Sequence, residues 1–125
     1  MSLPLEGVKV LDLSRLLPGG FCSLLLADFG AEVLKVEDVN LGDYVRWAPP
    51  KYEGAEDSAA GALFLALNRN KSSIRIDLKS DGGREVFLRL AREHDVVLEL
   101  NGNRKECPAH AASRSASTVA SSRFR

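Results

Sequence analysis

The chain has 125 residues, of which 45% are hydrophobic and 27% are charged, and its formal net charge is zero. This length and apolar content predict one globular domain and argue against a disordered or fibrous protein. The N-terminus lacks a basic stretch followed by an apolar one, and no apolar run is long enough to span a bilayer. Its two cysteines are too few for a disulfide framework, so we expect a cytoplasmic protein with no membrane segment.

The first predicted unit is a strand, a helix and a second strand. Residues 7–14 form an apolar run that predicts a buried strand. Residues 21–29 contain no helix breaker and place Phe21, Leu24, Leu25 and Phe29 at helical spacing, with Gly30 placed to end the helix. Residues 31–37 predict the next strand, which completes a right-handed βαβ unit.

The following residues repeat the alternation after a long polar loop at 38–57. Residues 58–68 predict a short apolar helix, and residues 72–78 alternate apolar and polar side chains as a strand does. Residues 80–94 predict an amphipathic helix, capped by Ser80 or Asp81, in which the shared apolar face comprises Val86, Phe87, Leu90 and Ala91. Residues 95–100 predict the last strand.

These elements define the expected fold class, which is α/β. We expect a parallel sheet with helices on its faces over residues 1–100. Residues 101–125 have no apolar period and contain five Lys or Arg residues against one acidic residue. This basic, Ser, Ala and Arg-rich tail is expected to be disordered, because it offers little apolar surface to offset the entropy of ordering it. Its scattered arginines do not predict nucleic-acid binding.

One turn and one acidic residue suggest a dinucleotide-binding site as a hypothesis. The segment LLPGGF joins the first strand to the first helix, where free backbone N–H groups would favour an anion, and Gly19 and Gly20 would allow its close approach. Glu37 ends the second strand, where dinucleotide-binding domains keep a ribose-binding acid. The turn lacks the G-x-G-x-x-G pattern, so an NAD-binding domain is a disfavoured alternative.

Other polar residues have ordinary structural interpretations. Four basic residues cluster around the third predicted strand, namely Arg69, Lys71, Arg75 and Lys79. They either hold phosphates or form a solvated face, and we favour the solvated face. Cys22 is expected in the core, and His94 is expected in the last turn of a helix. Cys107 and His110 supply only half of a zinc-site spacing, so no metal site is predicted. No nucleophile, base and orienting acid can be assembled, and no catalytic residue is assigned.

Five segments, in order, carry a resemblance to a known family over residues 3–99. They are PLEGVKVLDLS at 4–14, PGGFCSLLLADFGAEVLKVE at 18–37, GDYVR at 42–46, LNRNKSSIRIDLKSDGGREVFLRL at 67–90 and DVVLE at 95–99. Their sequence and spacing are similar to the start of the class III coenzyme A transferases. This CaiB/BaiF group also includes alpha-methylacyl-CoA racemases and formyl-CoA transferases.

The resemblance implies a site, a substrate and an assembly. It implies an incomplete Rossmann-like domain and a homodimer that binds CoA or acyl-CoA as substrate at the carboxyl ends of the strands. The positions that match CoA-lining residues of the family are Leu17, Asp38, Ile76, Lys79 and Leu100. Asp38 departs from the family, in which many members have an arginine there for the nucleotide phosphates.

The resemblance stops after residue 99, where the family continues with a phrase such as SFRPGVLDRLGVGYE and this chain has LNGNRKECPAHA. The family's catalytic aspartate, or its His and Asp pair, comes later still. We therefore expect a truncated N-terminal portion with weak CoA binding and no catalysis alone, whose tail is out of frame or disordered. The alternative is a stand-alone nucleotide-binding or interaction module with a native tail.

Overall fold

The computed structural model describes residues 2–52, 61–100 and 119–121, the last three for their backbone only. Five parallel strands form one sheet in the order β3-β2-β1-β4-β5. Their bounds are β1 Lys9–Asp12, β2 Glu32–Glu37, β3 Lys71–Arg75, β4 Val96–Glu99 and β5 Val119–Ser121. The helices are α1 Leu16–Asp28, α2 Ala62–Asn68 and α3 Asp81–Glu93, with a short 3-10 helix, η1, at Tyr44–Arg46. The expected α/β class is confirmed.

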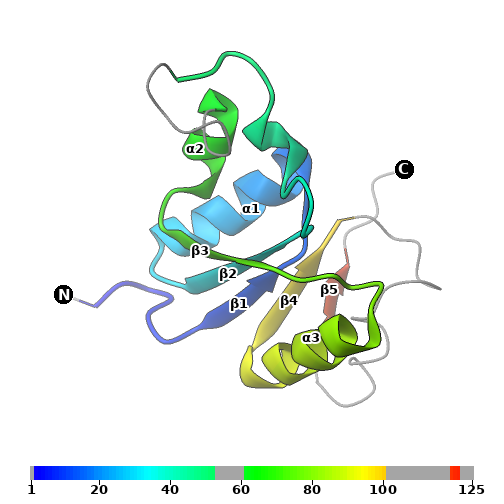
Figure 1. Cartoon of the computed structure of the whole chain (residues 1–125). Coiled ribbons are helices and arrows are strands. Elements are labelled where there is room, and N and C mark those ends of the chain that lie inside the picture. Colours follow the sequence, from blue (N-terminus) through cyan, green and yellow to red (C-terminus); the bar gives the residue numbers. More distant parts are fainter. Residues whose placement is uncertain (1, 53–60, 101–118, 122–125) are drawn as a thin grey trace.

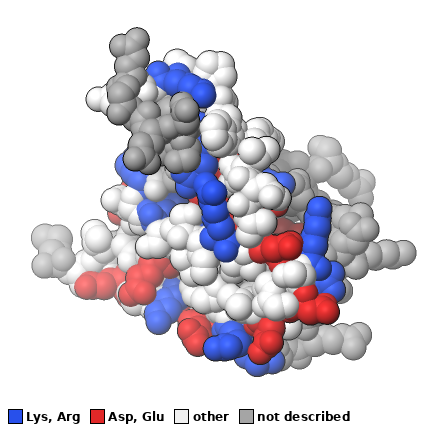
Figure 2. Space-filling model, in the orientation of Figure 1, with Lys and Arg blue, Asp and Glu red and all other residues white. Residues whose placement is uncertain are grey.

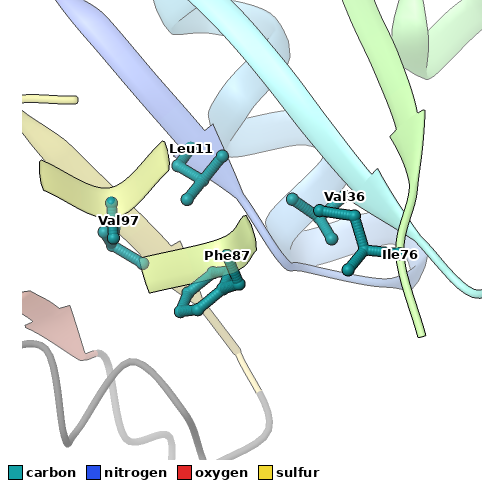
Figure 3. Close-up of a cluster of buried hydrophobic side chains, with 6 residues drawn as sticks. Leu11, Val36, Ile76, Phe87 and Val97 are labelled. Atoms are coloured by element: carbon teal, nitrogen blue, oxygen red, sulfur yellow. The ribbon is translucent and has the colours of Figure 1, made fainter. Parts of the chain in front are cut away.

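The helices cover opposite faces of the sheet (Figure 1). α3 packs Phe87 and Ala91 against the side chains that one face presents, namely Leu11, Val36, Ile76 and Val97 (Figure 3). α1 packs Ala27 against the other face, on Val10, Val33 and Leu98. The alternation of neighbours such as Val10 and Leu11 between the two cores is the period of two expected of a strand buried on both faces.

α3 matches its predicted pattern closely. The Ser80 side chain caps it by accepting a hydrogen bond from the Gly83 N–H at 3.0 Å, as one of the two predicted caps would. Phe87 and Ala91 are buried, whereas Val86, predicted on the same face, is exposed. The outward side of the molecule around α3 carries interspersed acidic and basic side chains (Figure 2), which is typical of an amphipathic surface helix.

α1 differs from its prediction in both its start and its buried face. It begins at Leu16, so that Gly19 and Gly20 lie inside its first turns rather than in a turn before it. Its buried residues are mainly small, whereas the predicted apolar residues Phe21, Leu25 and Phe29 are exposed. A Cβ on Gly19 would lie 2.2 Å from the Ser14 Cβ, so the first turn of α1 lies too close to the segment after β1 for a side chain at that position. Cys22 is exposed, and its predicted place in the core is wrong.

The remaining boundaries are close to prediction except in the tail. β3 ends at Arg75 rather than at residue 78, and residues 58–60 of the predicted second helix lie outside the described residues. The structure describes only Val119–Ser121 of the tail, and these three residues form β5 alongside β4, where we expected no strand. The backbone groups of a sheet edge offer hydrogen bonds to any extended segment, whatever its side chains. In the described part of the chain, no helix has the length and apolar content to cross a membrane.

Candidate functional site

The strand order defines where a ligand is expected. The chain runs from β1 to β2 through α1 on one face of the sheet, and from β3 to β4 through α3 on the other. The order therefore reverses between β1 and β4, which are hydrogen-bonded neighbours. In open parallel sheets, ligands bind outside the carboxyl ends of the strands at such a reversal. We call this region, where the strands end at Asp12, Glu37, Arg75 and Glu99, the carboxyl edge.

Four of the five predicted site residues follow strand ends with at least part of the side chain accessible. Leu17 is 54% exposed in the first turn of α1, and Leu100 directly follows β4 and is half-buried. Asp38 directly follows β2 and is half-buried, and Lys79 is exposed in the turn between β3 and α3. Because parallel strands end at the same edge of a sheet, these four residues share the carboxyl edge.

Ile76, the fifth predicted residue, has a different environment. Its side chain is buried in the core with Leu11 and Phe87, on the α3 face of the sheet. Its backbone N–H donates to the Glu37 carbonyl oxygen at 3.0 Å, which extends the contact between β2 and β3. The structure therefore gives the Ile76 side chain a packing role and leaves Leu17, Asp38, Lys79 and Leu100 at the edge.

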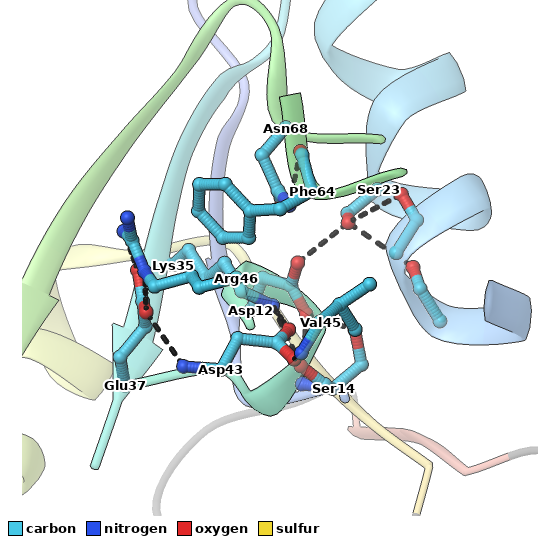
Figure 4. A network of polar contacts seen from close by, with 12 residues as sticks. Asp12, Ser14, Ser23, Lys35, Glu37, Asp43, Val45, Arg46, Phe64 and Asn68 are labelled. Carbon is cyan, nitrogen blue, oxygen red and sulfur yellow. Dashed lines mark hydrogen bonds and ion pairs between the residues drawn. The ribbon is translucent and has the colours of Figure 1, made fainter. Parts of the chain in front are cut away.

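A network of buried polar side chains lies beneath the carboxyl edge, on the α1 face (Figure 4). Asp12 ends β1 and accepts hydrogen bonds from the Ser14 backbone N–H at 2.8 Å and from the Ser23 hydroxyl of α1 at 2.5 Å. The Lys71 ammonium of β3 donates to the Ser23 Oγ at 2.7 Å and lies 3.7 Å from the Asp12 carboxylate. This part of the network joins β1, α1 and β3.

A second part of the network ties the loop after β2 to the sheet. The Lys35 ammonium donates to the Ser14 carbonyl oxygen and pairs with the Asp43 carboxylate, both at 2.9 Å. Glu37 accepts two hydrogen bonds from the Arg46 guanidinium, both at 2.7 Å, and one from the Asp43 backbone N–H at 2.8 Å. The same guanidinium lies 3.8 Å from the centre of the Phe64 ring of α2, in a cation–π contact.

Burial and pairing shift the pKa of two members of this network. Burial raises the pKa of Glu37, but the hydrogen bonds and charge of Arg46, with bonds from Ser73 and the Asp43 N–H, outweigh it and lower that pKa to about 2. Burial lowers the pKa of Lys71 to about 8, with the charge of Lys35 acting in the same direction and Asp12 opposing both. Glu37 is therefore a fixed anion, occupied by its partners, and not the free ribose-binding acid considered from the sequence.

Three residues of the network were not predicted from the sequence to lie together. Ser23, Lys71 and Asp12 supply a hydroxyl, an amine of lowered pKa and a carboxylate, which is the composition of an activated nucleophile. The Ser23 and Asp12 side chains are both 0% exposed, however, so no substrate can reach the hydroxyl. We assign the three residues a structural role. Lys35 and Glu37 are charged residues in a strand that the structure buries, and such charges need partners, which here are Asp43 and Arg46.

The other residues considered from the sequence are the basic residues near β3, one histidine and the pair Cys107 and His110. Among the basic residues near β3, Arg69 pairs with Asp28 at 2.5 Å and Lys71 belongs to the buried network, whereas Arg75 and Lys79 are exposed. His94 is the C-cap of α3, and its Nδ1 lies 2.6 Å from the Leu90 carbonyl oxygen. Cys107 and His110 lie outside the described residues.

The fold is that of a doubly wound α/β domain, a class in which ligands bind outside the carboxyl ends of the strands. The family model for CoA-transferase family III matches residues 5–106, and the chain belongs to that family. It is 44% identical over 95 residues to the succinyl-CoA:mesaconate CoA-transferase of Haloarcula hispanica, covering 76% of this chain and 24% of that one. It is 45% identical over 97 residues to the human succinyl-CoA:glutarate CoA-transferase, covering 77% of this chain and 21% of that one.

A solved structure of a CaiB/BaiF family protein from Brucella suis is similar as well, with a TM-score of 0.73 and 42% sequence identity. The similarity covers 81% of this chain and 26% of that chain. The chain thus spans about a quarter of the length of the relatives it matches. The resemblance inferred from the sequence is confirmed at the level of the family.

Proposed function

We propose that this chain binds the nucleotide end of a CoA thioester at its carboxyl edge, as the N-terminal part of a family III CoA-transferase or a related racemase. The observation that carries the proposal is the reversal of strand order at β1 and β4, within a segment that belongs to this family. The exposed ammonium of Lys79 supplies a cation for a phosphate at that edge. We further propose that the intact protein is a cytoplasmic homodimer that uses no metal.

We also propose that residues 1–125 alone do not catalyse acyl transfer or racemisation. Acyl transfer through a covalent intermediate needs an accessible, positioned carboxylate, and racemisation needs an acid and a base on opposite faces of a carbon. The accessible Asp38 lies at the edge where we propose that the nucleotide end binds, and not the thioester. The carboxylates beneath that edge, Asp12, Glu37 and Asp43, are at most 4% exposed and are held by cations or N–H groups. Their role is to hold the fold, which leaves them unavailable to a thioester.

Calorimetry tests the binding site. CoA should bind the wild-type chain and stabilise it against heat, whereas NADH should do neither. The Lys79→Glu variant should bind CoA on the order of tenfold more weakly, because an attractive charge becomes a repulsive one. The control is Lys9→Glu, which makes the same charge change at an exposed residue that begins β1 at the opposite edge. Equal CoA affinities for the two variants would refute the role of Lys79.

A second candidate function follows from β5. Val119–Ser121 of the tail pair with β4, as a native extension of the sheet would. This favours a stand-alone nucleotide-binding or interaction module with a native tail. Deleting residues 101–125 should lower the melting temperature if the tail belongs to the fold, and should leave it unchanged if the tail is out of frame.

A further inference from the structure

Leu16 has an unusual backbone conformation at the start of α1. Its φ is +63°, in the left-handed region, which leucine rarely adopts. Among the described residues, the other non-glycine residue with a positive φ is Asn70, at +62°, and asparagine tolerates this conformation well. Leu16 is 45% exposed, so full burial of its side chain does not offset the cost. The conformation must therefore be imposed by the contacts that hold the chain on either side of it.

One buried carboxylate, that of Asp12, fixes the chain on both sides of Leu16 (Figure 4). Before Leu16, the Ser14 backbone N–H donates to the Asp12 Oδ1 at 2.8 Å. After it, the Ser23 hydroxyl of α1 donates to the Asp12 Oδ2 at 2.5 Å. Gly19 also lies so close to Ser14 that an added Cβ would be 2.2 Å from the Ser14 Cβ. The chain must therefore reverse its direction within the few residues after Ser14, and the left-handed backbone of Leu16 allows this.

The turn that contains Leu16 lies at the reversal of strand order. The Leu13 N–H donates to the Leu98 carbonyl oxygen of β4 at 2.9 Å, so the chain leaves β1 alongside β4. Leu17, the next residue after Leu16, is 54% exposed in the first turn of α1. A right-handed Leu16, with a φ of about −60°, would rotate the following chain by about 120° around one bond and displace Leu17. The conformation of Leu16 therefore determines where Leu17 lies at the carboxyl edge.

We propose that Leu16 is a positioning residue for CoA binding, and that its left-handed backbone, not its side chain, holds Leu17 and the turn after β1 in place at the carboxyl edge. This rests on the proposed function, since it takes the nucleotide end of a CoA thioester to bind at this edge. Backbone strain persists where the surrounding structure over-determines it, and it fixes the geometry of a binding site before the ligand arrives. A substitution of Leu16 should therefore change CoA affinity according to how well the new residue adopts a positive φ.

The test compares substitutions that differ in their tolerance of a positive φ. Leu16→Asn and Leu16→Gly remove the leucine side chain and favour the left-handed backbone, whereas Leu16→Thr introduces a β-branched residue that disfavours it. The matched control is Asn70→Thr, which introduces the same residue at the other left-handed position. Asn70 directly precedes β3, at the end of the strand opposite to the carboxyl edge. Asn70→Thr should lower the melting temperature and leave the CoA affinity unchanged, because its strain lies away from the site.

The measurements are the melting temperature and the dissociation constant of CoA, by calorimetry, for the full chain and each variant. Leu16→Asn and Leu16→Gly should bind CoA within about threefold of wild type, and Leu16→Thr should bind it on the order of tenfold more weakly. Wild-type affinity in a folded Leu16→Thr variant would overturn the positioning role. A tenfold loss in Leu16→Asn and Leu16→Gly would overturn it as well, even if Leu16→Thr did not fold. Either result leaves the proposed function standing, whereas a wild-type chain that does not bind CoA would overturn the proposed function and this inference with it.

Discussion

The two faces of the sheet are held by different interactions. On the α3 face, Phe87 is fully buried against Leu11 and other apolar side chains. On the α1 face, the apolar contacts of Val10 and Val33 give way towards the carboxyl edge to buried charges, among them Lys35. The same strands therefore present an apolar core on one side and a paired ionic network on the other.

The difference indicates what each face contributes. Apolar burial is not directional and stabilises the fold in proportion to area. Buried ion pairs are directional and contribute little net stability, but they are costly to break. The network contacts Ser14 after β1 and Asp43 after β2, so it fixes the backbone of the loops at the carboxyl edge. We infer that the α3 face stabilises the domain and the α1 face positions the candidate site.

The largest expected effect comes from breaking one buried pair. Lys35→Met leaves the Asp43 carboxylate, which is 4% exposed, without its ammonium partner at 2.9 Å. It should reduce the free energy of unfolding by about 3–5 kcal/mol, which is a large share of the stability of a small domain. Urea denaturation measures this loss. The double variant Lys35→Met/Asp43→Asn should recover part of it, because the uncompensated charge is gone; a single variant as stable as wild type would contradict the role of the pair.

Acidification should destabilise the protein by protonating Glu37 in the ionic network on the α1 face. Because the pKa of Glu37 is lowered from 4.5 to about 2 in the folded protein, its contribution to stability is complete above pH 4.5 and is lost as the pH falls through 2. The contribution is at most about 3 kcal/mol. In urea denaturation at a series of pH values, Glu37→Gln should be less stable than wild type at neutral pH and should lose less stability on acidification. If the two proteins lost stability in parallel, the ionic role of Glu37 would be wrong.

Alanine substitutions at two glycines should give the smallest changes in stability, and each serves as the control for the other. Gly19→Ala places a Cβ 2.2 Å from the Ser14 Cβ, beside the network, and should cost about 1–3 kcal/mol. Gly82→Ala, near the start of α3, has no atom within 4 Å of the new Cβ and should stabilise the chain by about 0.5–1 kcal/mol. The thermal midpoints of the two variants should therefore move in opposite directions. Shifts of the same sign would mean that α1 does not pack closely on Ser14.

Much of the fold could be predicted from the sequence, because the apolar residues of the strands and of α3 recur at the spacings typical of those elements. The run at residues 31–37 predicted β2 at Glu32–Glu37, and Ser80 predicted the start of α3. The buried face of α1 was missed because the prediction followed large side chains such as Phe21. The helix is close to the sheet through small residues at a spacing of four, Gly19, Ser23 and Ala27, and that spacing was the available signal.

The candidate site was harder to predict than the fold. The family resemblance named Asp38, Lys79 and Ile76 together, but the burial of the Ile76 side chain depends on how α3 packs against the sheet. The partners of Glu37 come from Arg46, in a loop without a regular period, and from Ser73 of β3. Side chains brought together by long-range packing leave only indirect traces in a single sequence, such as an unexplained charge in a buried strand.

The central claim is that CoA binds at the carboxyl edge, and mapping backbone amide signals by NMR tests it most directly. On titration with CoA, the account predicts shifts at the strand ends and following turns, including Leu17, Asp38, Lys79 and Leu100. Signals at the opposite edge, from Lys9, Glu32 and Asp95, should remain in place. Shifts centred on those opposite-edge residues, or no shifts at a CoA concentration that stabilises the chain, would contradict it.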